Sequence, residues 1–193
     1  MQLKQRILRL VLALSLAVGL GVPARAADTG AGQSYEKAAA FTVEALPAPK
    51  VSSIGGEWAV IGLRRGGAGA PEGYYQTYYA ALEGYTAQRG GVLHEKKYTE
   101  HSRAILAVTA LGRDARDVAG HDLTLPLGDY DKTVWQGVNG PIWALIALDS
   151  GDYPIPANTG AETQATRQMY VDYILNGQLP DGSWSLSGGG DPD

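Results

Sequence analysis

Few side chains in this sequence could carry out covalent or metal chemistry. The 193-residue chain has no cysteine, which removes thiolate nucleophiles, disulfides and the sulfur ligands of zinc. Its three histidines, His94, His101 and His121, are scattered at spacings that match no standard zinc site. His101 and Ser102 could be combined with Asp122 into a catalytic triad, but no motif positions these side chains together. The residues therefore favour binding over catalysis.

The composition narrows the class of partner. A net charge of −4 and a pI near 5.4 give no basic surface for nucleic acid. An apolar content of 45% is ordinary for a globular protein, and the eleven tyrosines against one phenylalanine suit half-wet helix faces and cavity walls. These numbers predict a globular chain whose partners are not nucleic acids.

The first 26 residues have the features of a secretory signal peptide. A basic start precedes the apolar run Leu10–Val22, and Ala24-Arg25-Ala26 forms an A-x-A cleavage site. The apolar run is short for a transmembrane span, although a membrane anchor is the alternative. The mature protein would then begin at Ala27, without a membrane span, and be secreted or held at the cell surface. The lack of cysteine in an exported protein favours a bacterial source.

Two amphipathic helices are predicted in the first half of the mature chain. Ser34 is placed to cap a helix over Tyr35–Leu46. Pro71 is placed to open a helix over Glu72–Gln88, whose tyrosines make one aromatic stripe and which ends at Gly90-Gly91.

A second kind of helix is apolar nearly all round and recurs three times. The octapeptides Gly56–Leu63, Ala104–Leu111 and Pro141–Leu148 align without a gap, with large, small and closing leucine positions in register. The offsets between their last residues, 111 − 63 = 48 and 148 − 111 = 37, fall in the range of helical repeat architectures. The stripe of small residues lets helices approach closely. The repeat unit is therefore an outer amphipathic helix, a Gly-rich turn and an inner apolar helix.

The last predicted helix carries an unusual ending. An amphipathic run from Thr166 to Ile174 stops at Asn176-Gly177, and Gln178, Gly182 and Trp184 follow around a Pro-Asp-Gly turn. An amide side chain with donors and an acceptor can satisfy orphan groups at a helix end. The alternative is a plain turn with a tryptophan that only packs.

Two stretches depart from the repeat. Between Asp114 and Gly137 the outer helix is abbreviated, because Pro126 and Gly128 break any longer helix. Ser187–Asp193 has the composition of a linker followed by a helix start, with no helix after it. We expect a sequence truncated at its C-terminus, a frayed tail being the alternative.

The Gln178, Gly182 and Trp184 spacing resembles the QW motif of the terpenoid cyclase and protein prenyltransferase superfamily. Together with the repeat and the signal peptide, it makes the chain resemble the front of a bacterial exported protein with prenyltransferase/squalene-cyclase-type repeats. Such proteins are similar in architecture to the cobalamin carriers transcobalamin and intrinsic factor. The resemblance covers Tyr35–Asp193 and implies an all-α fold, a partial α/α toroid of alternating outer amphipathic and inner apolar helices over residues 27–193. In the family, the glutamine amide reaches the end of a neighbouring helix and the tryptophan ring stacks on the same turn.

The resemblance also implies where a ligand would bind. In the family, ligands enter at the end of the toroid where the inner helices begin. Transferred to this repeat, that end presents seven candidate ligand-binding residues: Glu57, Trp58, His101, Arg103, Trp135, Gln136 and Asn139. Five of them also have a named structural interpretation: Glu57 and Asn139 as helix caps, Trp58, like Trp143, as wedged core, and His101 and Arg103 as solvated side chains.

Three functions stay open at this point. Non-catalytic binding of a small molecule, with a corrinoid as the specific candidate, is preferred. Terpenoid cyclisation in the family uses an Asp-x-Asp-Asp acid, of which Asp191-Pro-Asp193 supplies only the first three positions. Prenyl transfer would need a zinc site for which this chain lacks the cysteine, so neither a metal nor another cofactor is expected. A structural or adhesive cell-surface module is the remaining alternative.

Overall fold

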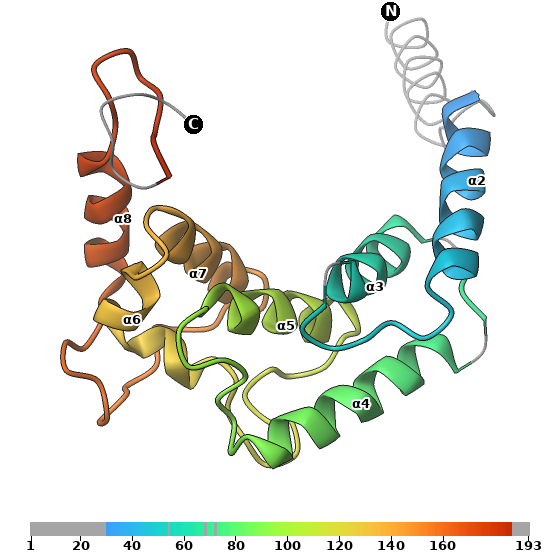
Figure 1. Cartoon of the computed structure of the whole chain (residues 1–193), viewed down its shortest axis with the longest axis horizontal. Helices are drawn as coiled ribbons and strands as arrows, with labels where there is room; N and C mark the ends of the chain where they lie inside the picture. Colours follow the sequence, from blue (N-terminus) through green and yellow to red (C-terminus); the bar gives the residue numbers. More distant parts are fainter. Residues whose placement is uncertain (1–29, 54, 68, 72, 187–193) are drawn as a thin grey trace, which may run out of the picture. The chain divides into compact units, whose positions relative to one another are not determined.

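The computed structural model describes residues 30–53, 55–67, 69–71 and 73–186, and every regular element within them is a helix. The described chain is therefore all-α, as the sequence predicts (Figure 1). The elements in order are α2 (Gly30–Ala45), α3 (Gly56–Gly66), α4 (Tyr74–Gln88), α5 (Thr99–Ala110), the 3-10 helix η1 (Leu125–Gly128), α6 (Tyr130–Val134), α7 (Asn139–Asp149) and α8 (Arg167–Asn176).

Two predicted segments lie outside the described residues: the signal peptide at 1–26 and the linker with its acidic end at 187–193. The chain divides into two units between Ala38 and Ala39, inside α2, and the second unit holds all the other elements. None of the helices in the described ranges has the length and apolar character that crossing a membrane requires.

The three apolar octapeptides form three helices that pack in series. α5 packs against α3 on one side and against α7 on the other (Figure 1). The shared small position of the repeat, Ala59, Ala107 and Ala144, is buried in all three helices. Because an alanine lets two helix backbones approach closely, this row sets the spacing of the series. The three predicted apolar helices are thus present, although α5 begins five residues before its octapeptide.

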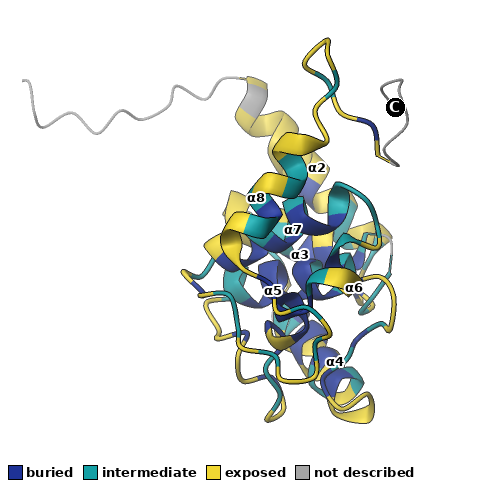
Figure 2. Ribbon diagram, turned by 90° about the vertical axis from the view of Figure 1, so that its left-hand side faces the viewer, coloured by how far each residue is buried: buried dark blue, intermediate teal, exposed yellow. Residues whose placement is uncertain are grey.

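α4 supplies the aromatic stripe that covers α3 and α5. Its buried side chains are Tyr74, Tyr78, Tyr79, Leu82 and Thr86. The three tyrosines and Leu82 join the apolar residues of α3 and α5 in one hydrophobic core, and Figure 2 shows the buried residues in dark blue. The helix ends at Arg89, and Gly90 and Gly91 then take positive φ values of 58° and 86°, which glycine adopts without steric cost.

Two short helices in the second half of the chain begin at side-chain N-caps, α8 at Thr166 and α6 at Asp129. Thr166 accepts a hydrogen bond from the Met169 amide and begins α8, as the run from Thr166 predicts. Asp129 caps α6 in the same way through the Lys132 amide. In the first half, the predicted cap at Ser34 is wrong. The described helix already runs from Gly30, and the Ser34 hydroxyl donates to the Gly30 carbonyl inside it, 2.7 Å away.

Candidate functional site

The N-terminal ends of α3, α5 and α7 line a common hollow of about 130 Å³. Its walls come from α3, α5, α7 and the loop before α7, and consist of Trp58, Thr99, Arg103, Gln136, Asn139 and Trp143. Four of these six, Trp58, Arg103, Gln136 and Asn139, are among the candidate ligand-binding residues that the family resemblance implies. They meet because the octapeptides pack in register, so the starts of α3, α5 and α7 reach the same edge of the series.

Two tryptophans form the apolar wall of this hollow. The ring centroids of Trp58 and Trp143 are 5.2 Å apart, with the planes tilted by 56°. Trp58 is 41% exposed, although a tryptophan would gain free energy by burial. Both side chains line the hollow, and Trp143 also packs against the hydrophobic core. The pair offers an apolar face at the surface of the protein.

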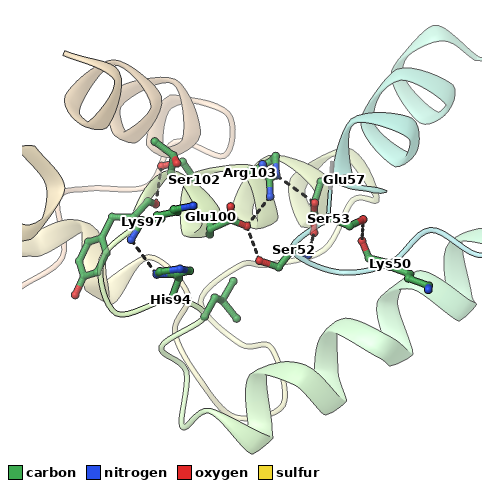
Figure 3. Close-up of polar contacts among 12 residues, drawn as sticks. Lys50, Ser52, Ser53, Glu57, His94, Lys97, Glu100, Ser102 and Arg103 are labelled. Atoms are coloured by element: carbon green, nitrogen blue, oxygen red, sulfur yellow. Dashed lines mark hydrogen bonds and ion pairs between the residues drawn. The ribbon is translucent and has the colours of Figure 1, made fainter. Parts of the chain in front are cut away.

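A buried ion cluster fixes the polar wall. The Arg103 Nε donates to Glu57, 3.1 Å away, and its Nη2 donates to Glu100 (Figure 3). The Glu57 side chain is only 2% exposed and that of Arg103 is 17% exposed. Because water is largely excluded, each charge depends on its partners. Glu57 therefore acts on the hollow by holding Arg103 and does not line it.

Ser52 ties the loop before α3 into the same cluster. Its backbone N–H donates to Glu57 over 2.6 Å, and its hydroxyl donates to Glu100 over 2.5 Å. Ser52 has a φ of 56°, which is uncommon for a residue with a side chain. The two carboxylates hold this strained conformation, and they also lie in the first turns of α3 and α5, where negative charge is favourable. No periodic pattern pointed to Ser52, because it lies in a loop.

The two amide side chains that line the hollow, Gln136 and Asn139, differ in the hydrogen bonds they already make. The Oε1 atom of Gln136 accepts from both the backbone N–H and the hydroxyl of Thr99, at 3.2 and 3.1 Å. Asn139, at the start of α7, makes no side-chain hydrogen bond within the described part of the chain. An amide has two donor hydrogens and an acceptor oxygen. Asn139 is thus the side chain most available to a ligand, whereas Gln136 joins the loop to α5.

His101 does not reach the hollow. It lies two residues before Arg103, about 200° away around the helix, and is fully buried on the opposite side of α5. Its Nε2 accepts from the Leu93 amide at 3.1 Å, and its ring lies edge-on to Tyr98. Burial lowers the pKa of His101 to about 3, and His94 adds to this while the Leu123 backbone opposes it. His101 is a neutral core residue that is neither solvated nor placed to bind a ligand in the hollow.

This burial predicts a loss of stability in mild acid. The unfolded chain takes up a proton at His101 near the ordinary pKa of 6.5, whereas the folded chain does so only near about 3. The free energy of unfolding is therefore full above pH 6.5 and falls below it, by up to about 1.4 kcal/mol per pH unit. Urea unfolding of His101→Gln between about pH 7 and pH 4.5 should lack this slope. His94→Gln is the matched control and should keep it, and equal slopes in the two variants would contradict the assignment.

Trp135 also lies away from the hollow. It follows α6, is 60% exposed, and its ring faces the Lys96 ammonium at 5.9 Å from the ring centroid. The next residue, Gln136, turns toward Thr99 instead. Adjacent residues in the loop thus point to different surfaces.

The motif after α8 caps its own helix. The Trp184 indole N–H donates over 2.6 Å to the carbonyl of Ile174 in the last turn of α8, which also accepts from the Gly177 N–H at 3.2 Å. The Gln178 amide donates to the Gly182 carbonyl over 2.9 Å, whereas the resemblance places this amide at a neighbouring helix. The physical reason is local: Gly182 has a φ of 87°, and the tight turn carries its carbonyl back toward Gln178.

The residues considered for catalysis are engaged elsewhere. The Ser102 hydroxyl donates to the Tyr98 carbonyl, and Asp122 accepts from the amide and hydroxyl of Thr124. Across the described ranges, no group of three or more histidine, aspartate or glutamate side chains is arranged to hold a metal ion. The acidic end Asp191–Asp193 lies outside the described residues.

Comparison with known proteins adds no relative: neither protein-family models, nor curated proteins, nor solved structures match this chain. The geometry of the hollow and of its supporting ion cluster is therefore the basis for assigning a function.

Proposed function

We propose that this protein is a non-catalytic binding module built from prenyltransferase/squalene-cyclase-type helical repeats. Its ligand site is the hollow where α3, α5 and α7 begin. The observation that carries the proposal is the convergence of Trp58, Arg103, Gln136 and Asn139 from three successive repeats on that one hollow. In-register packing brings these side chains to one edge, and there they combine an apolar tryptophan face with amide and guanidinium groups that a ligand could contact.

The geometry supports a ligand that presents a flat or apolar face with polar groups at its rim. A volume of about 130 Å³ corresponds to roughly four water molecules, so the hollow holds a part of a ligand and the rest covers its opening. The Trp58 and Trp143 rings provide the apolar contact, and Asn139 provides donors and an acceptor. A corrinoid, whose broad macrocycle carries amide side chains, is the specific candidate.

The local charge favours a neutral or weakly cationic ligand over an anion. Arg103 is the only cation among the residues lining the hollow, and it is already paired with Glu57 and Glu100. Two carboxylates against one guanidinium leave the cluster with one negative charge. The first turns of three helices attract anions in general, but here glutamates occupy two of these positions.

The proposal also includes export of the protein and a partial α/α toroid as its architecture. The alternation of inner helices α3, α5 and α7 with the outer helices α4 and α8 (Figure 1) supports a partial α/α toroid. Export through residues 1–26 rests on the sequence, and N-terminal sequencing of the protein secreted by a bacterial host tests it. A chain that begins at Ala27 is the expected result, and retention of Met1 in the membrane fraction would favour an anchor.

The binding experiment is a titration of the purified protein with cobalamin and with cobinamide, followed by visible absorbance and tryptophan fluorescence. We expect a saturable change at a stoichiometric ratio. Trp58→Ala should weaken binding by roughly tenfold or more, as expected for an aromatic anchor. Trp135→Ala is the matched control outside the hollow and should leave the affinity within about twofold.

The other functions become outcomes of this titration. If neither corrinoid gives a saturable change, the corrinoid is excluded and other flat neutral ligands are tested against the same two variants. If Trp58→Ala and Trp135→Ala lose affinity equally, the hollow is not the site. A structural or adhesive module without a ligand is then the better interpretation, and terpenoid cyclisation depends on Asp191 and Asp193, outside the described residues.

A further inference from the structure

A second and larger hollow lies between α6, α8 and the residue that precedes α7. Its volume is about 420 Å³, within the range of small-molecule sites. It is lined by Tyr130, Val138, Met169, Asp172, Tyr173, Asn176, Gly177, Ser185 and Leu186. None of these residues lines the hollow beside Trp58, so the two hollows are separate.

Two tyrosine rings form a corner of this hollow. The rings of Tyr130, the first residue of α6, and Tyr173, on α8, meet edge to face with centroids 6.4 Å apart and planes at 76°. Tyr170 stacks behind Tyr130 at 5.9 Å and donates a hydrogen bond to the Leu127 carbonyl over 2.7 Å, so it anchors Tyr130 from the core side. Aromatic faces at right angles can both contact one bound cation.

The residues that line this hollow carry negative charge only. Asp172 is the only charged residue among those that line it, and its Oδ1 accepts from the Gln168 amide over 2.8 Å. Burial raises the pKa of Tyr130, and Tyr173, Asp131 and Asp172 raise it further. The nearest described cation on α6, Lys132, faces Asp129 at 3.7 Å. The electrostatic environment thus favours positive charge beside the Tyr130 ring.

We propose that this second hollow binds an organic ammonium ion, with the cation against the faces of Tyr130 and Tyr173 and near the Asp172 carboxylate. The apolar substituents on the nitrogen would contact the Met169 and Val138 side chains. Aromatic corners combined with a carboxylate are how proteins recognise quaternary ammonium groups. An anionic ligand would be repelled here, and a neutral one would gain only the apolar contacts.

The test uses choline as the probe, with the neutral alcohol in which carbon replaces the quaternary nitrogen as its matched ligand. Binding to the full chain is followed by backbone amide chemical shifts. We expect saturable shifts at Tyr130, Asp172 and Tyr173 with choline and affinity weaker by about threefold to tenfold for the neutral alcohol. Asp172→Asn, which keeps the shape of the side chain, should weaken choline binding to a similar degree.

Two further variants complete the design. Tyr173→Leu should also weaken choline binding, whereas Asp117→Asn, an equal charge change at an exposed residue outside the hollow, should leave it unchanged. Equal affinity for choline and the neutral alcohol would overturn the proposal, as would the absence of saturable shifts in the parent protein. Unchanged choline binding in Asp172→Asn would overturn it too, without any concern about folding, since an exposed aspartate is replaced by its amide.

Discussion

Replacing Arg103 by alanine is expected to lower the free energy of unfolding by about 3 kcal/mol, the low end of the range for breaking a buried ion pair. The variant leaves the Glu57 carboxylate, 2% exposed, without its arginine partner, while the Ser52 amide still donates to it. A buried charge without its counterion is costly because neither water nor a second charge compensates it. Part of the loss is also the packing of the arginine stem. Urea unfolding at neutral pH measures the difference.

Arg116→Ala is the matched control for this prediction. Arg116 and Asp114 form an ion pair of 2.7 Å, but their side chains are 55% and 46% exposed. Exposed pairs contribute about 0–1 kcal/mol, so this variant should lose little stability although its distance is shorter than the 3.1 Å between Arg103 and Glu57. Similar losses in the two variants would show that burial does not determine the contribution of the Arg103 cluster.

Gly140→Ala should destabilise the protein by about 3 kcal/mol or more, because the new methyl group has no room. A Cβ atom on Gly140, in the first turn of α7, would lie 1.7 Å from the Thr133 carbonyl oxygen of α6. The obstacle is backbone, which cannot rotate away as a side chain could, so α6 and α7 would have to separate. Thermal or urea unfolding of the variant measures the loss.

Gly84→Ala provides the opposite expectation for the same chemical change. Gly84 lies inside α4, and a Cβ there would have no neighbour within 4 Å. Alanine in place of glycine in a helix interior stabilises by roughly 0.5–1 kcal/mol. If both glycine variants shift stability in the same direction, the close approach of α6 to α7 at Gly140 is not a determinant of the fold.

The sequence predicts most of the helices because their signals are local. The octapeptide pattern locates α3, α5 and α7, and the pair Asn176-Gly177 locates the end of α8. The start of α2 is predicted wrongly, because the Ser34 hydroxyl can make either of two local hydrogen bonds. It can cap a helix that begins after it, or bond back to the carbonyl four residues before it, as it does.

The candidate site could be predicted only in part, for a geometric reason. Alignment of the repeats gives the height of a residue along its helix but not the direction in which its side chain points. Trp58, Arg103 and Asn139 have both the right height and the right face. His101 has the right height but the opposite face, and faces the core. Loop residues such as Ser52 carry neither kind of signal.

The Ser52, Glu57, Glu100 and Arg103 cluster has a consequence for how the chain folds. Its bonds join residues that are 46 and 48 positions apart, so they close a long loop that costs entropy before any contact repays it. Helix α4 lies within that loop, and once helical it rises only about 1.5 Å per residue. Early formation of α4 would shorten the chain to be closed and bring α3 toward α5. Helix α4 would then have two roles: it covers the core, and it shortens the chain that separates α3 from α5 during folding. The ion cluster would form after α3 and α5 have paired, and it would stabilise that pairing.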